Sequence, residues 1–304
     1  MPHQRPRLTW KIREGELPLG ARTIVIGCVD LSAQSWPVKP DPDACLRHAQ
    51  RHLEAGAEIV DVSALPGPPV SVRMSADEEL RRLVPTLRKL RSGLDAPVCV
   101  TTYNAETAER VLELEASIIH DPTGLALDPP MGRVINATDA GVILGHAPGP
   151  PEMWNRARPV ARFMDSLLHE LDSAVARARQ AGLERRRVAV DPGLGRGKKA
   201  SQSWEVLERL GDLRTLGQPV GISPSRLPFL TDSVKAPELE WTMAASVAVT
   251  LAVRGSAHFV RVREVEQLAA VVRAADRWSE ALEEIDRDAE ERARAGAPAQ
   301  GRKR

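Results

Sequence analysis

The chain has 304 residues, a length that fits one large domain and that α/β barrels commonly reach. It carries 42 Lys and Arg against 41 Asp and Glu, a formal net charge of +1, so its charge gives no argument for nucleic acid or an acidic membrane. Aromatic residues make up only 3%, too few for stacking platforms along single-stranded nucleic acid. We therefore expect neither nucleic acid nor a membrane as partner.

The cysteines and the apolar segments indicate the compartment. Cys28, Cys45 and Cys99 show no CxxC or Cys/His spacing, which indicates small core residues in a reducing compartment. Residues 1–10 are polar and contain prolines, unlike a signal peptide. The longest apolar run, Met243–Val253, is too short to span a bilayer and is typical of a buried helix. The sequence predicts a soluble, cytoplasmic protein.

The chain begins with a predicted hairpin, Leu8–Ile12 and Glu16–Leu19, in an N-terminal extension of residues 1–21. Residues 22–288 then alternate short apolar runs with amphipathic stretches, as repeated βα units do. Residues 289–304 form a small, polar and basic tail that is expected to be disordered.

The pattern predicts eight strands, at Thr23–Val29, Glu58–Val62, Val98–Thr102, Ser117–His120, Val142–Gly145, Val188–Val190, Pro219–Ile222 and Ala257–Val262. It predicts helices at Pro42–Glu54, Ala76–Arg91, Ala105–Leu114, Met131–Ala137, Val160–Gln180, Gln202–Leu216, Glu240–Arg254 and Val265–Asp288. Eight alternations with nearly continuous apolar strands favour a closed (β/α)8 TIM barrel. A doubly wound open sheet is the alternative.

The most informative stretch is Arg185–Lys199, where a short apolar strand ends on Asp191 and breaks into a glycine-rich loop. A carboxylate at the C-terminal end of a strand lies at the edge where α/β folds bind ligands. An ordinary βα turn whose Asp caps the next helix would look the same. The loop is not a phosphate-binding P-loop, because only three residues separate Gly193 from Gly197 and Lys199 stands in place of the hydroxyl residue.

Polar side chains follow the other predicted strands as well. In a barrel all of these ends meet at one rim, and they are Asp30 and Ser32, Asp61 and Ser63, Thr101 and Thr102, His120 and Asp121, His146, Asp191, Ser223 and Ser225, and Arg261 and Arg263. Each residue alone could be a helix cap or a solvated loop side chain. Together they predict a polar site at the rim.

From about Leu8 to Trp278 the sequence resembles the dihydropteroate synthase family, whose enzymes are TIM barrels. The resemblance rests on six blocks in the family's order: Ile26-Gly-Cys-Val-Asp-Leu-Ser32, Gly56-Ala-Glu-Ile-Val-Asp-Val62, Thr102-Tyr-Asn-Ala-Glu-Thr-Ala108, Ile119-His-Asp-Pro-Thr-Gly124, the glycine-rich loop after Asp191, and Arg261-Val-Arg-Glu-Val265. Such enzymes bind hydroxymethyl-dihydropterin pyrophosphate in the barrel, release pyrophosphate with Mg²⁺, and join the pterin to p-aminobenzoate. The resemblance also implies a homodimer formed through the last helices.

The resemblance maps the family's pterin-binding Asp, Asn and Asp onto Thr101, His120 and Asp191, so one carboxylate is kept and two residues differ. It maps the first-strand Asn of the pyrophosphate site onto Asp30, which would repel an anion unless a cation such as Mg²⁺ lay between them.

The pyrophosphate site retains possible anion ligands. Arg261 and Arg263, two residues apart on one strand, form a candidate anion site with Ser32. The family's second-loop Arg is absent, and its seventh-strand Lys is lost unless Arg226 takes its place after a shift of one residue. Leu194 and Arg196 replace phenylalanines near the benzoate ring.

Three hypotheses follow. The chain is a divergent, pterin-binding barrel with weak or no classical condensation of dihydropterin pyrophosphate with p-aminobenzoate, whose ligand is a pterin or another phosphorylated compound. Alternatively, it is a functional dihydropteroate synthase of folate biosynthesis. A third reading is a non-catalytic paralogue that acts as a binding or partner protein. Fold analogy alone does not choose among them, because function depends on the site.

Overall fold

A computed structural model describes residues 5–33, 35–36, 38–67, 72–156, 160–231 and 238–296. Within them an eight-stranded parallel sheet has the order β8-β7-β6-β5-β4-β3-β10-β9. The strands are β3 (Ile24–Asp30), β4 (Ile59–Ser63), β5 (Val98–Thr101), β6 (Ile118–Asp121), β7 (Gly141–Gly145), β8 (Val188–Asp191), β9 (Gly221–Ile222) and β10 (Phe259–Val262). A parallel bridge between Val190 and Val220 joins the two ends of the sheet. The predicted TIM barrel is confirmed.

The strand register places the polar ends next to one another. Asp30 pairs with Ser63, Thr101 pairs with His120, and Gly145 pairs with Asp191. Since all eight strands are parallel, these residues lie at one rim of the barrel, the rim where TIM-barrel sites are built.

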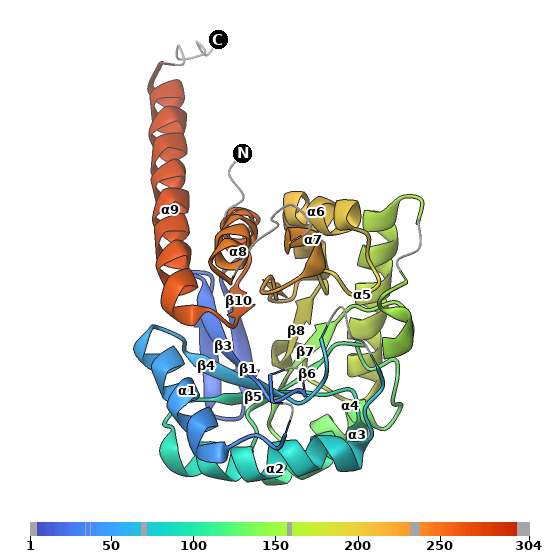
Figure 1. The fold of residues 1–304 in the computed structure, drawn as a ribbon. Helices are drawn as coiled ribbons and strands as arrows, with labels where there is room; N and C mark the ends of the chain where they lie inside the picture. Colours follow the sequence, from blue (N-terminus) through green and yellow to red (C-terminus); the bar gives the residue numbers. More distant parts are fainter. Residues whose placement is uncertain are drawn as a thin grey trace.

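Helices surround the sheet (Figure 1). They are α1 (Pro42–Glu54), α2 (Ala76–Gly93), α3 (Ala105–Glu113), α4 (Met131–Asn136), α5 (Phe163–Gln180), α6 (Ala200–Glu208), α7 (Pro228–Thr231), α8 (Glu238–Arg254) and α9 (Val265–Gly296), with 3-10 turns η1 (Pro151–Met153), η2 (Arg185–Arg187) and η3 (Leu210–Leu216). Side chains cap two of the helix starts: Asp41 accepts from the backbone of Asp43, and Ser75 accepts from the backbone of Glu78. These polar residues directly before apolar periodic stretches explain where α1 and α2 begin.

Apart from shifts of up to three residues at the ends of elements, three features differ from the prediction. The predicted helix Gln202–Leu216 divides into α6 and η3, because Arg209 leaves helical geometry at φ −106°, ψ 20°. The short helix α7 was not predicted, since its four residues are too few to show a period.

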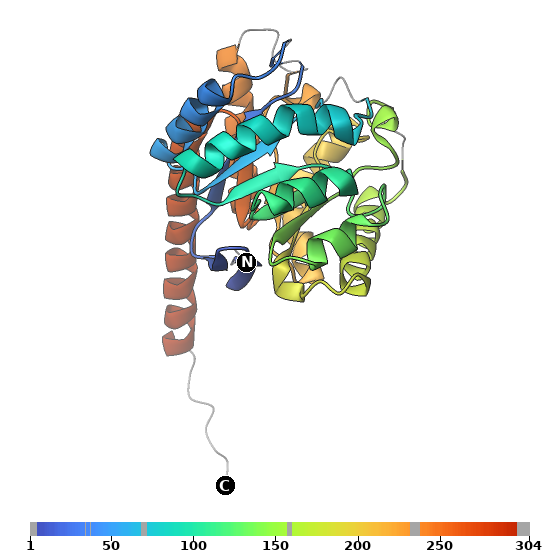
Figure 2. The same ribbon diagram turned by 90° about the horizontal axis from the view of Figure 1, so that it is seen from below.

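The last helix α9 continues past the predicted end at Asp288 to Gly296, because residues 289–295 are Ala, Glu and Arg, all good helix formers. Figures 1 and 2 show α9 projecting beyond the barrel. Of the predicted disordered tail, residues 297–304 lie outside the described residues.

The predicted hairpin is present as β1 (Leu8–Ile12) and β2 (Gly15–Leu19), paired antiparallel. It closes the N-terminal end of the barrel. Trp10 is fully buried, stacks on Phe259 with ring centroids 5.5 Å apart, and donates from Nε1 to the carbonyl of Arg187 at 3.1 Å. Its apolar partners point inward from seven strands of the sheet, namely Ile24, Ile26, Ile59, Cys99, Ile118, Ile143, Ala189 and Phe259. The hairpin therefore covers the apolar core at the N-terminal end of the barrel.

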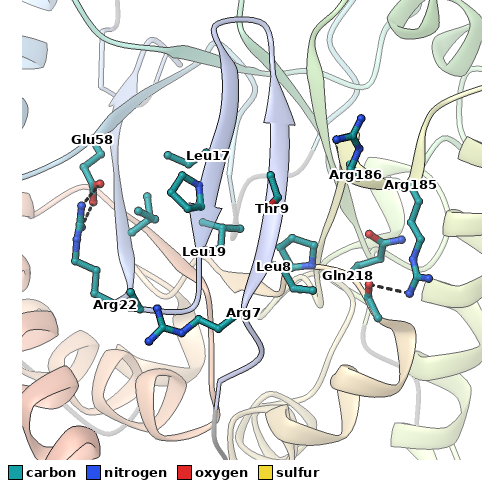
Figure 3. Close-up of a pocket in the computed structure, with 15 residues that line it drawn as sticks. Arg7, Leu8, Thr9, Leu17, Leu19, Arg22, Glu58, Arg185, Arg186 and Gln218 are labelled. Carbon is teal, nitrogen blue, oxygen red and sulfur yellow. Dashed lines mark hydrogen bonds and ion pairs between the residues drawn. The ribbon is translucent and has the colours of Figure 1, made fainter.

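A hollow of about 770 Å³ lies at this N-terminal end (Figure 3). The hairpin strands run through its centre, Arg22 pairs with Glu58 on one side, and Arg185 donates to the carbonyl of Gly217 on the other. Because TIM-barrel enzymes have their active sites at the opposite rim, we assign the residues around this hollow to stabilising the fold and not to binding a ligand. In the described part of the chain, no helix is long and apolar enough to cross a membrane.

Candidate ligand site at the barrel mouth

A cavity of about 330 Å³ opens at the C-terminal ends of the strands. Its walls combine charged residues with apolar ones, and they include Cys28, Asp30, Asp61, Ser63, Leu65, Thr101, Pro122, Trp154, Arg196, Ser223, Ser225, Arg226, Leu227, Trp241, Arg261 and Arg263. Burial raises the pKa of the Cys28 thiol to about 12, so this cysteine is a neutral wall residue and not a nucleophile.

Arg261 lies at the floor of this cavity with only 5% of its surface exposed. Its Nη2 donates to Asp61 Oδ2 at 2.6 Å and to Thr101 Oγ1 at 2.7 Å, and its Nη1 donates to Ser223 Oγ at 2.7 Å. Burial opposes its charge, but the Asp61 carboxylate beside it raises the pKa of Arg261 above the ordinary value. The guanidinium is therefore a fixed, paired cation at the barrel axis.

The three predicted pterin-binding residues, Thr101, His120 and Asp191, lie together in this polar network. The Thr101 hydroxyl donates to Asp61 Oδ1 at 2.9 Å and lies 3.0 Å from His120 Nδ1. Because that hydroxyl hydrogen is used on Asp61, Nδ1 of His120 must carry the donated hydrogen, which leaves Nε2 as an acceptor. Burial, with the charge of Arg261, holds the pKa of His120 well below its ordinary range, so the ring is neutral.

Asp191 is completely buried at the end of β8. Its Oδ1 accepts from the backbone of Gly193 at 2.8 Å, and its Oδ2 accepts from Ser223 Oγ at 2.8 Å. Oδ2 also lies 3.8 Å from His120 Nε2, a buried atom with no hydrogen-bond partner in the described structure. Two acceptors thus stand side by side beneath Arg261, whose Nη1 is 3.9 Å from Asp191 Oδ2.

The predicted anion residues are Ser32, Arg261 and Arg263. Both arginines line the cavity, Arg261 from β10 and Arg263 from directly after it, but each is paired with a carboxylate: Arg261 with Asp61, and Arg263 with Asp30 at 2.9 Å. Ser32 is fully buried outside the cavity lining, and its Oγ is unpartnered in the described structure.

Asp30 was the candidate Mg²⁺ ligand. Its Oδ1 accepts from the backbone of Ser32 at 2.8 Å, and its Oδ2 accepts from Ser35 Oγ at 2.5 Å and pairs with Arg263. No group of three or more His, Cys, Asp or Glu that could hold a metal ion occurs among the described residues. The residues around Asp30 do not fit a resident Mg²⁺ ion, because Arg263 already supplies the positive charge next to the carboxylate.

Arg226, the possible replacement for the family Lys, lines the mouth and donates from Nε to Glu264 Oε1 at 2.7 Å. Asp121, at the end of β6, points into its own turn, where it accepts from the backbones of Thr123 and Leu125. Of the predicted rim residues, Asp121 therefore supports the loop rather than the cavity.

The Lys198 side chain fixes the glycine-rich loop after β8 by hydrogen bonds to backbone carbonyls. This side chain is 7% exposed, and its Nζ donates to His146 Nδ1 at 2.9 Å, to the carbonyl of His146 at 3.1 Å and to the carbonyl of Gly193 at 2.8 Å. Gly193 has φ +66°, and a Cβ there would meet the carbonyl oxygen of His146 at 2.0 Å. Burial lowers the pKa of Lys198 to about 7. The lysine thus places the loop that carries Leu194 and Arg196 over the mouth.

The cavity also contains side chains that sequence reasoning did not select. Trp154 comes from the loop after β7 and Trp241 from α8. Trp154 follows the Pro-rich segment of residues 148–151, and Trp241 lies in the first turn of α8, so in neither case does an apolar period mark the aromatic side chain as facing the site.

The fold and this site define a closed parallel barrel with a polar, ligand-sized mouth. Residues 35–263 match the family model described as "Pterin binding enzyme", so the chain belongs to the pterin-binding enzyme family. Among curated proteins it is 28% identical to a dihydropteroate synthase of Synechocystis sp. over 84% of this chain and 90% of that one, and 29% identical to that of Bacillus subtilis over 84% and 88%.

Solved structures agree with this assignment. The chain is similar to a Burkholderia cenocepacia dihydropteroate synthase complexed with 7,8-dihydropteroate, with a TM-score of 0.81 and 25% identity over 91% of this chain and 99% of that one. It is also similar to a Xanthomonas albilineans dihydropteroate synthase solved with 4-aminobenzoic acid, with a TM-score of 0.79 and 26% identity over 89% and 97%.

Proposed function

We propose that this protein binds a pterin at the barrel mouth and performs the classical condensation with p-aminobenzoate only weakly or not at all. The observation that carries the binding proposal is the buried acceptor pair, His120 Nε2 and Asp191 Oδ2, 3.8 Å apart beneath the cavity. The pyrimidine edge of a pterin presents a ring N–H beside an exocyclic amine, two adjacent donors. Such a ligand would satisfy His120 Nε2, since buried polar atoms are normally paired.

The weak-activity proposal rests on Arg261, which lines the cavity while His120 and Asp191 do not, and whose Nη1 is 3.9 Å from Asp191 Oδ2. A pterin that reaches Asp191 has to displace the guanidinium from Asp61, and opening a buried ion pair costs about 3–5 kcal/mol. Thr101 offers a hydroxyl where the family resemblance expects a carboxylate, so positive charge that develops on the pterin is less well stabilised. Loss of one such contact typically costs about 10²–10³ in rate.

The donor's leaving group would lie near Arg263 and Ser32 on the other side of the mouth. Arg263 shares its charge with Asp30, so an anion there gains less than it would from an unpaired guanidinium. Mg²⁺ fits this proposal only as a counter-ion that arrives with pyrophosphate, because the side chains around Asp30 do not form a cage for it.

The binding test is titration of purified protein with 6-hydroxymethylpterin. We expect wild-type binding, loss of at least about tenfold in affinity in Asp191→Asn, because the amide places a donor against a ligand donor, and no change in the exposed Asp95→Asn. Absence of pterin binding by wild-type protein would favour the non-catalytic paralogue.

The activity test is dihydropteroate formation from the pterin pyrophosphate and p-aminobenzoate with Mg²⁺. We expect a rate at least about a thousandfold below that of a dihydropteroate synthase such as the Bacillus subtilis relative, and no rescue of a strain that lacks its own synthase. Ordinary turnover, or rescue at ordinary expression, would return the chain to the functional synthase of folate biosynthesis.

The proposal includes a homodimer through the last helices. Met243 and Val247, four residues apart on α8, are 63% and 53% exposed, which is unusual for large apolar side chains on a helix that packs on the barrel. A second copy of the chain would cover them.

A further inference from the structure

Among the described residues that line the mouth, Arg196 differs from the three other cations. Arg261 pairs with Asp61, Arg263 with Asp30, and Arg226 with Glu264. The side chain of Arg196 makes no hydrogen bond or ion pair with any residue that the structure describes, and its Nε is buried without a partner.

The surroundings of Arg196 orient it toward the cavity. Its guanidinium carbon lies 5.7 Å from the ring centroid of Trp154, a side chain only 3% exposed, and both residues line the mouth. The glycine loop that carries Arg196 is fixed by Lys198, which donates to the carbonyls of Gly193 and of Arg196 itself. The guanidinium is thus held between an aromatic wall and open cavity space.

The positive charge of Arg196 has no described counter-charge within ion-pair distance. Burial lowers the pKa of Arg196, while Asp191 attracts its charge from a distance greater than an ion pair. Each oxygen of Asp191 accepts one hydrogen bond, Oδ1 from the Gly193 amide and Oδ2 from Ser223, and no hydrogen bond or ion pair joins this carboxylate to Arg196 in the described structure. A cation–π contact compensates only part of the hydration that a guanidinium loses on burial. An anion that enters the cavity would complete the site.

We propose that Arg196 forms an anion-binding position on the β8 side of the mouth, opposite the paired arginines of β10. The ligand class is a small organic molecule with one carboxylate or phosphate on a flat or apolar body, because the apolar side chains of Leu65, Trp154, Leu227 and Trp241 also line the cavity of about 330 Å³. This proposal rests on the proposed function only in placing the ligand at the same mouth. It assigns recognition of the anionic group to Arg196 on the glycine-rich loop and not to Arg261 and Arg263.

The test compares matched probes by isothermal titration calorimetry. 4-Aminobenzoate and its neutral isostere 4-aminobenzamide differ by one charge, and inorganic pyrophosphate probes a phosphate source. We expect wild-type protein to prefer the carboxylate over the amide by about tenfold or more, as a charge-assisted hydrogen bond provides. Arg196→Gln should reduce that preference to within about twofold. The exposed Arg88→Gln should retain it, and so should Arg263→Gln, whose charge is already paired.

The two anionic probes, 4-aminobenzoate and pyrophosphate, show whether the site binds a carboxylate or a phosphate group. If Arg196→Gln weakens 4-aminobenzoate only, the site takes the carboxylate of an acceptor molecule; if it weakens pyrophosphate only, the site takes a phosphate group. Either result supports the proposal. An unchanged carboxylate preference together with unchanged pyrophosphate affinity in Arg196→Gln would overturn it, as would loss of the preference in Arg263→Gln alone.

Two controls separate this inference from folding and from the proposed function. Arg196→Phe removes the charge but keeps contact with Trp154, so it should unfold at least as cooperatively as wild type and still lose the preference for the carboxylate. Neutral 6-hydroxymethylpterin should bind wild type and Arg196→Gln within about threefold of each other, because no anion is involved. Failure of the pterin to bind either protein would count against the proposed function, while the carboxylate and amide arms would still decide the role of Arg196.

Discussion

The ion pair between Arg261 and Asp61 organises the barrel mouth at the scale of single residues. The guanidinium donates to Asp61 at 2.6 Å and to Thr101 and Ser223 at 2.7 Å. The Ser223 hydroxyl in turn donates to Asp191. Arg261 of β10 is thereby paired with Asp61 of β4 and linked through Ser223 to Asp191 of β8, and all three charged side chains are buried. Such an arrangement stabilises one geometry of the site and resists a ligand that needs the same atoms.

Removing Arg261 should therefore destabilise the fold. Arg261→Ala leaves Asp61 buried without its cation, and we expect a loss of about 3–5 kcal/mol in the free energy of unfolding. The double variant Asp61→Asn, Arg261→Met removes both charges and should recover most of that loss. Urea denaturation measures both values. A single variant within about 1 kcal/mol of wild type would show that the pair is not desolvated as the structure has it.

Glu79 gives a second residue-scale prediction, in the pH dependence of stability. This buried carboxylate on α2 accepts at Oε2 from Thr102, Asn104 and Thr107, and so anchors the loop that follows Thr101. Burial raises its pKa from 4.5 to about 7, although those three hydrogen bonds lower it. Between these two values the native state keeps a proton that the unfolded chain has released. Stability therefore falls as pH rises through this window, by about 3 kcal/mol for this group.

Glu79→Gln should remove that slope. The destabilisation caused by the substitution, measured by denaturant unfolding, is expected to be larger at pH 5 than at pH 8 by about 3 kcal/mol. The exposed Glu106→Gln provides the control, because its effect should not vary with pH in this way. A Glu79→Gln penalty that stays constant from pH 5 to pH 8 would contradict the buried, protonated carboxylate.

At the scale of elements, periodicity predicted the eight strands, the hairpin and most helices with small shifts at their ends. The apolar strands and the caps Asp41 and Ser75 are local signals, so they can be recognised in the sequence. What periodicity did not reveal depends on distant contacts. The pairing of Arg261 with Asp61 joins residues 200 positions apart, and the position of Trp154 over Arg196 depends on the loop after β7. Sequence reasoning placed the strand-end residues at one rim, but it could not decide which charges pair with one another or that Ser32 would lie outside the cavity lining.

The hairpin β1–β2 is an element whose role can be measured directly. Trp10→Ala would open a cavity against Phe259 at the bottom of the barrel, and we expect a loss of about 3–5 kcal/mol in the free energy of unfolding. Trp10→Phe keeps a stacked ring and loses mainly the bond to the Arg187 carbonyl, so about 1–2 kcal/mol is expected. Equal, small losses in both variants would mean that the hairpin does not seal the core.

At the scale of the whole molecule, the barrel leaves its two last long helices on one side. Helix α8 packs along α9, and α9 then projects beyond the body of the barrel (Figures 1 and 2). Trp278 and Ile285, seven residues apart on α9, are 42% and 62% exposed. Residues at that spacing lie on the same face of a helix. Exposed large apolar side chains on both helices indicate a surface suited to contact with an apolar surface of another protein.

A second copy of the chain is the proposed partner, since a symmetric contact buries the same apolar residues twice. We expect light scattering after size exclusion to give about twice the 33.2 kDa of one chain. Met243→Glu with Val247→Glu places two charges on the exposed face of α8 and should shift the mass to that of a monomer, because unpaired charges are costly at the centre of an interface. The control, Val38→Glu, changes an 80% exposed valine before α1 and should leave the dimer intact. A wild-type mass near 33.2 kDa across the concentrations tested, or an unchanged mass in the Met243 and Val247 double variant, would rule out α8 as the contact.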